Sequence, residues 1–134
     1  MAECKVVRAG DAYAGKQGLT YFHGVSAESV GSRGLCLHRL TIPPGGRANA
    51  HMHEKHESAI AVLCGQADFW WGNRLEHHEL CGPGDHIYIP AGVPHLPANR
   101  TATEPCEAIV ARTDPSEQES VVLRLDLDAL VTEP

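Results

Sequence analysis

Short apolar runs, each closed by glycine, proline or a polar turn, dominate the pattern of this chain. We predict strands at residues 35–42, 59–64, 67–71, 86–89 and 107–111, and weaker ones at 4–7 and 21–22, because runs of this length between turn residues are typical of strands. The run at 59–64 contains no polar residue, which indicates burial on both faces. Near the C-terminus, Leu123, Leu125 and Leu127 alternate with charged residues, which predicts a further strand with one buried face.

The spacing of these runs predicts an all-β fold. No segment shows a helical period over more than a few turns, and the polar, glycine-rich residues 26–34 are expected to form a loop. Many short strands joined by glycine and proline turns favour an antiparallel sandwich or jelly-roll barrel. A length of 134 residues without an internal repeat fits one domain over residues 1–134.

Composition narrows the classes of partner. The net charge is −6, and without a basic stripe to neutralise phosphates we expect no binding to nucleic acid. No run approaches the length of a membrane-spanning helix, so we expect no membrane association. The five cysteines are odd in number and form no C-X-X-C pair. Small buried thiols are therefore expected rather than disulfides, in a reduced, cytoplasmic protein.

The candidate chemistry lies in the stretch GGRANAHMHEKHE, residues 45–57. His51 and His53 alternate, so on a strand both imidazoles project from one face. Glu57 has the same parity and joins them if the strand runs on without a bulge. Two neutral nitrogen donors and one carboxylate form a metal-ligand set.

A second stretch, residues 84–99, contains a glycine turn, a short apolar strand, a second turn and then His95. Together the two stretches resemble the two sequence motifs of the cupin superfamily. The first motif, over residues 45–65, is matched by Gly45, His51, His53, Glu57 and Gly65, with seven rather than six residues before the last glycine. The second, over residues 84–99, is matched by Gly84, Pro90, Gly92, His95 and Asn99.

This resemblance implies a single cupin jelly-roll barrel, a double-stranded antiparallel β-helix. It also implies that His51, His53, Glu57 and His95 bind one divalent transition metal ion. Imidazole suits Fe, Mn, Ni, Co, Cu and Zn, so the ligand types do not select among these metals. Single cupin domains often dimerise, and we expect a homodimer, for which the strand at 123–127 is a candidate contact.

The functional expectation is a metal-dependent enzyme that acts on a small organic molecule. A site of three histidines and a glutamate with open positions can hold a chelating substrate beside dioxygen, which favours dioxygenase-type chemistry. An isomerase, lyase or decarboxylase that uses the same metal as a Lewis acid is the alternative within enzymes. The other alternative is a cupin that binds or senses a small ligand without turnover.

Several residues keep more than one interpretation. His56 replaces Glu57 as a ligand if the loop bulges, acts as an acid or base at the rim, or is solvated. His38 is expected to be a hydrogen-bonded core residue, with pocket lining as its alternative. Arg112 binds an anionic substrate or forms a surface ion pair. Adjacent Trp70 and Trp71 must face opposite sides of their strand.

Overall fold

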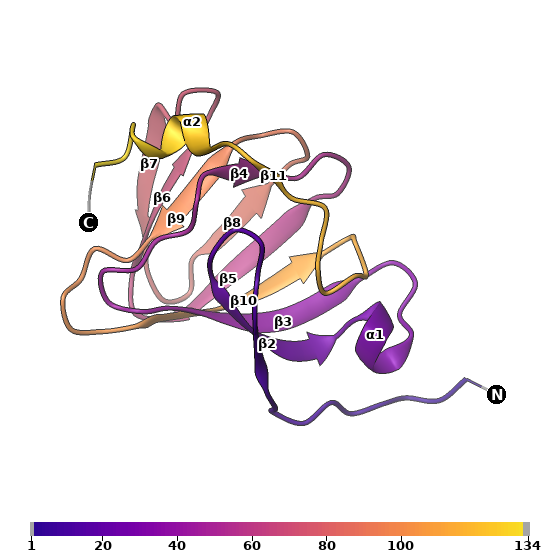
Figure 1. Ribbon diagram of the computed structural model, residues 1–134. Helices are drawn as coiled ribbons and strands as arrows, with labels where there is room; N and C mark the ends of the chain where they lie inside the picture. The colour runs from indigo at the N-terminus through magenta and orange to yellow at the C-terminus, as the bar shows by residue number, and fades with distance from the viewer. Residues whose placement is uncertain (1, 133–134) are drawn as a thin grey trace.

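Two antiparallel sheets face each other in the computed structural model, which describes residues 2–132 (Figure 1). One sheet has the strand order β1 (Ala12–Ala14), β2 (Thr20–Val25), β3 (Cys36–Ile42), β10 (Cys106–Arg112), β5 (Ser58–Cys64) and β8 (His86–Ile89). The other has the order β11 (Val122–Leu123), β4 (His51–Met52), β9 (His95–Ala98), β6 (Ala67–Trp71) and β7 (His77–Cys81). Two short helices, α1 (Ala27–Val30) and α2 (Leu125–Asp128), complete the described chain. The all-β prediction is confirmed.

An inner core fills the space between the sheets. In β3 every second side chain is buried, including Leu40 and Ile42, while Leu37 and Arg39 face outward. β10 pairs with β3 along its whole length and likewise buries Ala108. The period of two follows from the pleat, and removal of these apolar faces from water holds the sheets together.

A second, outer core lies between the five-stranded sheet and the C-terminal residues. Leu127 and Val131 are buried there against Ala50, Leu96 and Ala98. Figure 1 shows α2, in yellow, lying over this sheet. Leu127 reaches the sheet from α2 itself, and Val131 reaches it from the residues that follow the end of this helix.

The outer core explains why the prediction of a strand over residues 123–127 is wrong. Only Val122–Leu123 form a strand, β11, which pairs with β4 of the same chain. The next residues turn into α2, which buries Leu127 and leaves Leu125 58% exposed. The alternating leucines therefore do not mark one face of a strand, because packing against the sheet overrides their pattern.

Three further predictions need correction. Residues 4–7 form no strand, and the first strand is β1. The loop predicted at 26–34 contains α1, whose first turn is capped by the Ser26 hydroxyl accepting from the Ser29 N–H. β5 is buried on one face rather than two, with Ala59 and Leu63 exposed, because no layer of the described chain covers the outside of the six-stranded sheet.

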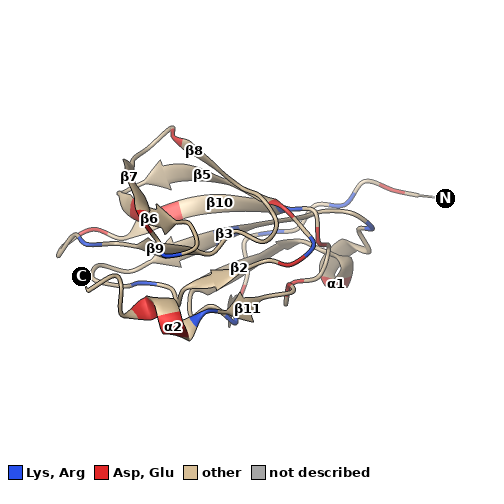
Figure 2. Ribbon diagram, turned by 90° about the horizontal axis from the view of Figure 1, so that it is seen from above, with Lys and Arg blue, Asp and Glu red and all other residues tan. Residues whose placement is uncertain are grey.

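Two structural features relate to the expectations about nucleic acid and membranes: the distribution of basic residues and the length of the helices. Figure 2 shows the basic residues dispersed over several elements, with no basic face in that view. Neither short helix within residues 2–132 is long and apolar enough to cross a lipid bilayer.

We predict that Leu127→Ala lowers the free energy of unfolding by about 2–4 kcal/mol, because it removes a buried anchor of the outer core. Leu125→Ala, two residues away on the exposed side of α2, is the matched control and should change stability by less than about 0.5 kcal/mol. Urea unfolding followed by circular dichroism measures both values. Equal effects of the two substitutions would contradict this account of the outer core.

Candidate metal centre

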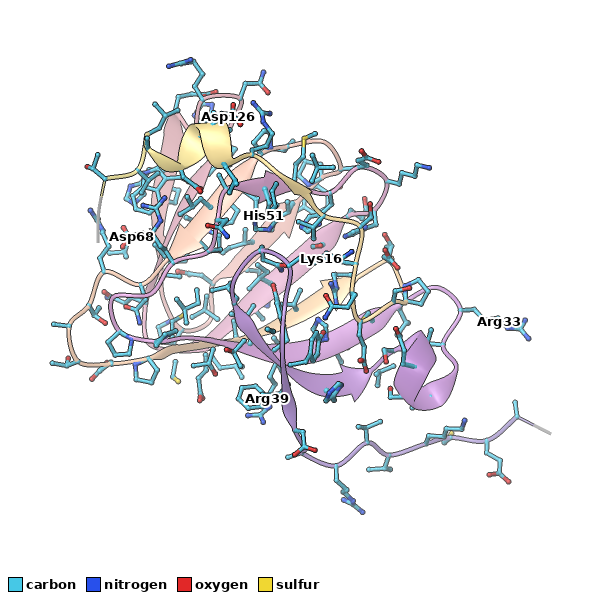
Figure 3. All side chains as sticks on the ribbon, viewed as in Figure 1. Lys16, Arg33, Arg39, His51, Asp68 and Asp126 are labelled. Carbon is cyan, nitrogen blue, oxygen red and sulfur yellow. The ribbon has the colours of Figure 1, made fainter. Side chains whose placement is uncertain are left out.

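The pairing of β4 with β9 brings two histidines together across the five-stranded sheet. His51 lies directly opposite His95 in the register, and their ring centroids are 4.3 Å apart. Both are buried, and Figure 3 shows His51 in the interior of the molecule. His53 follows the end of β4, with its ring centroid 5.3 Å from that of His51 and 5.1 Å from that of His95. The Gly92 N–H donates to the His53 carbonyl at 2.6 Å, which ties the two motifs to each other.

Each of these three rings has its Nδ1 beside a backbone carbonyl. The distances are 2.7 Å from His51 to Asn49 O, 3.0 Å from His95 to Val93 O and 3.4 Å from His53 to Ser120 O. A carbonyl only accepts, so each Nδ1 carries the proton and each neutral ring keeps its lone pair on Nε2. Ligand atoms of the three rings lie within 4.8 Å of one another.

Burial keeps the three imidazoles in their neutral form. It lowers the pKa of His51 to about 4, lowers that of His53, and takes that of His95 well below the usual value. Neighbouring imidazoles add to the effect, because protonation of one opposes protonation of the next. Neutral imidazole is the form that binds metals. The donor set therefore fits a divalent transition metal ion held by His51, His53 and His95.

Glu57 does not join this group. The strand is interrupted by a bend at residues 54–55 before β5 begins at Ser58. The parity set by His51 is lost in the bend, so Ser58 rather than Glu57 faces the interior. The Glu57 side chain is exposed and accepts a hydrogen bond from the Tyr88 hydroxyl at 2.9 Å. The expectation that Glu57 shares a face with the histidines required a strand without a bulge. The bend at residues 54–55 breaks this condition, so Glu57 faces solvent instead.

The bend instead turns His56 into the interior. Its ring centroid is 4.5 Å from that of His53, and its Nε2 donates to the Glu119 carboxylate at 3.0 Å. Glu119 is 4% exposed and forms a second group with the two histidines, within 4.8 Å of one another. Burial raises the pKa of Glu119, but the bond from His56 and the charge of Arg112 outweigh it and hold the pKa at about 2. This carboxylate is anionic at neutral pH.

Sequence reasoning missed Glu119 and misplaced Arg112. Glu119 lies in a polar segment that had the composition of a turn, 62 residues beyond Glu57. Arg112 is buried rather than at the surface, and its Nη1 lies 2.5 Å from a Glu119 oxygen. The one available signal was Arg112 itself, because it occupies an inward position of a strand and a buried guanidinium requires an anionic partner.

His38 is a hydrogen-bonded residue of the interior and belongs to neither histidine group. Its Nε2 accepts from Arg112 Nη2 at 2.6 Å, so its Nδ1–H donates to the Tyr13 hydroxyl at 2.8 Å. The hydroxyl in turn donates to the Glu117 carbonyl at 3.3 Å. This chain of bonds satisfies a polar cluster that would otherwise cost several kcal/mol to bury (~2–7 kcal/mol per unpaired group).

Two cavities meet at His95. A small one of about 30 Å³ is lined by the three histidines together with Arg112 and Glu119, and it has room for about one ion or water molecule. A larger one of about 380 Å³ opens between the edge strands β7 and β8. Its walls are mainly apolar and include Phe69, Trp71, Ile87, Ile89 and Val93. His95 and Ile89 line both cavities.

The fold agrees with comparisons to known proteins. Residues 38–112 match the family described as "Cupin domain", which is more than half of the chain, so this chain belongs to the cupin family. No curated protein matches the chain.

Solved structures show the same barrel. The chain is similar to the DMSP lyase DddQ from Ruegeria pomeroyi, with 28% identity and a TM-score of 0.58 over 69% of this chain and 44% of the lyase. It is also similar to the polyketide cyclase RemF from Streptomyces resistomycificus, with 24% identity and a TM-score of 0.71 over 98% and 95% of the chains. An oxalate decarboxylase from Lactobacillus farciminis gives 18% identity and a TM-score of 0.68 over 84% and 33%. The chain thus spans less than half of the lyase, and the other two likenesses concern the fold.

We predict that the free energy of unfolding of the metal-free protein decreases as the pH falls below about 6.5. In the His38→Gln variant this decrease per pH unit should be smaller than in the wild type. Burial, aided by Arg112, lowers the pKa of folded His38 to about 4. Between that value and the unfolded pKa of about 6.5, only the unfolded chain takes up this proton, so acid favours unfolding.

The substitution should flatten the dependence by up to about 1.4 kcal/mol per pH unit in this window and leave the slope above pH 7 unchanged. Chemical denaturation at several pH values between 4.5 and 8 measures both slopes. Identical slopes below pH 6 would show that His38 is not held neutral in the folded protein.

Proposed function

We propose that this cupin is a metal-dependent enzyme that acts on a small, largely apolar organic molecule, and that its chemistry is of the dioxygenase type. The observation that carries the proposal is the common state of His51, His53 and His95: buried, neutral and protonated at Nδ1. Three such rings would hold one divalent transition metal ion. Since first-row metals take four to six ligands, positions are left for water and substrate.

The larger cavity supports the substrate class. Its volume of about 380 Å³ suits a small organic molecule, and its apolar walls would favour an aromatic or aliphatic body over a charged one. Phe69 stacks on His95 with ring centroids 5.8 Å apart, so a molecule in the cavity lies beside a ligand imidazole. Glu79 of β7 and His86 of β8 supply polar groups on the two sides of the cavity. We expect these walls to exclude water around the reacting end of the molecule.

When bound, a redox-active ion would give the site access to dioxygen, and any of the divalent metals would polarise a substrate oxygen. The chain's own part is to bind and orient. The three imidazoles are preorganised by their carbonyl partners, and the cavity presents the substrate from the side of His95. Such prior ordering of ligands and substrate lowers the entropic cost of reaction.

A lyase is the second candidate, because the similarity to the DMSP lyase DddQ, at 28% identity, extends over 69% of this chain. The same cavity and the same three imidazoles would serve a metal that acts as a Lewis acid without oxygen. Oxygen consumption separates the two candidates, since a dioxygenase consumes one O₂ per turnover and a lyase none. Binding without any product would instead favour a sensing or carrier role.

We predict that the isolated protein contains close to one transition metal ion per chain and that His51→Ala and His95→Ala lower metal affinity more than about 100-fold, because each removes a ligand. The barrel should remain folded, since its core is formed by the apolar faces of the two sheets. Elemental analysis, chelator competition and circular dichroism test these points.

His86→Ala is the matched control for that experiment, because it removes an exposed histidine from β8, an edge strand of the other sheet. It should retain the metal. A wild-type protein that neither contains nor takes up a metal would overturn the proposed function.

We also predict that Ile87→Trp lowers turnover by at least about tenfold while leaving metal content unchanged, because the larger side chain fills the cavity. Leu63→Trp, on the exposed outer face of β5, is the control of equal size. Oxygen uptake and product formation would be measured on metal-loaded protein with catechols, diketones and keto acids. Equal turnover of both variants would show that substrate does not enter by this cavity.

A further inference from the structure

We propose that Glu119 supplies the carboxylate of the histidine site and positions the imidazole of His53 for metal binding, a task for which Glu57 of the first motif lies out of reach. This inference rests on the proposed function, because it assumes the metal held by His51, His53 and His95. Glu119 acts through His53, so it is a positioning residue rather than a ligand.

The Glu119 carboxylate is fixed on several sides. Its Oε2 lies 2.5 Å from Arg112 Nη1 and accepts from His56 Nε2 at 3.0 Å, while its Oε1 accepts from Gln17 Nε2 at 3.1 Å. The side chain is 5% exposed. Burying a carboxylate is unfavourable unless each oxygen finds a partner. Three inward residues from separate parts of the fold, Arg112, His56 and Gln17, therefore hold one anion at one place.

That place is beside the nitrogen of His53 that would not face the metal. Glu119 Oε2 lies 3.6 Å from His53 Nδ1, and the carbonyl of the next residue, Ser120, lies 3.4 Å from the same atom. Metal-binding histidines donate their second N–H to a carboxylate or carbonyl, which fixes the ring orientation and raises the basicity of the ligand nitrogen. Ser120 provides the carbonyl acceptor, and Glu119 places its carboxylate charge beside the same N–H, just beyond hydrogen-bonding distance.

His53 needs this distant partner, and the other two histidines do not. Each of His51 and His95 has its Nδ1 partner two residues earlier in its own strand segment. The partner of His53 comes from 67 residues further along the chain. The orientation of the third imidazole is thus determined by the C-terminal strap, which we define as residues 114–124.

The strap is anchored firmly enough to serve this purpose. The Lys16 ammonium donates to the Glu119 carbonyl at 3.2 Å, and the Arg124 N–H donates to the Ala50 carbonyl at 2.7 Å. Beyond Glu119 the strap becomes β11 and pairs with β4, the strand that carries His51 (Figure 1). The segment is therefore tied to the loop between β1 and β2 at Glu119 itself, and to β4, which carries His51, at its C-terminal end.

The geometry favours positioning over direct ligation by Glu119. Glu119 Oε2, the oxygen that faces the histidines, already lies 2.5 Å from Arg112 Nη1. A metal ion bound at this oxygen would therefore be repelled by the fixed positive charge of the guanidinium. The group of His53, His56 and Glu119 is disfavoured as a second metal site for the same reason.

The test compares Glu119→Ala, Glu119→Gln and Glu57→Gln by chelator competition with Zn²⁺ and Cu²⁺. We expect Glu119→Ala to weaken metal binding about 10–100-fold. Glu119→Gln, which keeps an acceptor but no charge, should give a smaller loss. Glu57→Gln is the matched control and should bind within about twofold of wild type. The Cu²⁺ electron paramagnetic resonance spectrum should change in Glu119→Ala and stay unchanged in the control.

A second measurement needs no metal. Nitrogen-15 correlation spectra of the metal-free protein report which ring nitrogen carries the proton. His53 should be protonated at Nδ1 in wild type and become a mixture of tautomers in Glu119→Ala, with His51 and His95 unchanged. If Glu119→Ala does not fold, because Arg112 is then buried without an anionic partner, the metal affinity and His53 spectrum of Glu119→Gln decide.

The outcomes separate the two proposals. Wild-type metal affinity and an unchanged His53 tautomer in the folded Glu119 variants would overturn the positioning role and leave the proposed function intact. A wild-type protein that binds no metal would overturn the proposed function and this inference with it. A loss of affinity in Glu57→Gln equal to that in Glu119→Ala would return the carboxylate role to the first motif.

Discussion

The register of β4 against β9 is the constraint on which the rest of the site depends. It sets His51 opposite His95 on the inner face of the five-stranded sheet. A slip of β4 by one residue would turn the His51 imidazole outward, because side chains alternate along a strand, while the pairing of β9 with β6 would keep His95 in place. Gly92 reinforces the register through its bond to the His53 carbonyl. At φ 79° it also takes a backbone conformation that side-chain-bearing residues rarely adopt. The two motifs are thus held together by backbone geometry before any metal is considered.

Part of the barrel interior contains buried charged residues, Arg112 and Glu119, in place of apolar side chains. A buried pair such as Arg112 and Glu119 contributes little net stability compared with apolar residues of the same size, although removing one partner alone is strongly destabilising. Here the pair is extended by His56, His38 and Gln17 into a network that satisfies most of its polar atoms. A network of this kind fixes positions more than it stabilises the fold. Its place beside His53 is consistent with a role in function.

The sequence predicted what depends on local pattern and missed what depends on distant packing. Most strands, the all-β class and the shared face of His51 and His53 followed from period and turn residues, and the addition of His95 followed from the resemblance to the cupin motifs. Glu57 failed because its parity argument required a continuous strand, and a bend at residues 54–55 cannot be read from composition. Glu119 was missed because nothing near it in sequence distinguishes it from a solvated turn residue. The strand predicted over residues 123–127 was wrong because its alternating leucines continue into α2, where packing against the sheet determines which of them are buried.

These misses are connected, because both the helix and Glu119 belong to the part of the chain that returns over the five-stranded sheet. α2 and Val131 seal the outer core, and Arg47 donates to the Asp128 carbonyl at 2.9 Å on the same side. If the strap could detach, the third imidazole would lose its acceptors while the first two kept theirs. A ligand that requires all three rings would therefore bind the attached form more tightly and stabilise it by mass action. Metal binding and closure of the outer core are in this way expected to be linked, and the two regions adjoin each other, because Ala50 and Leu96 of that core are the chain neighbours of His51 and His95.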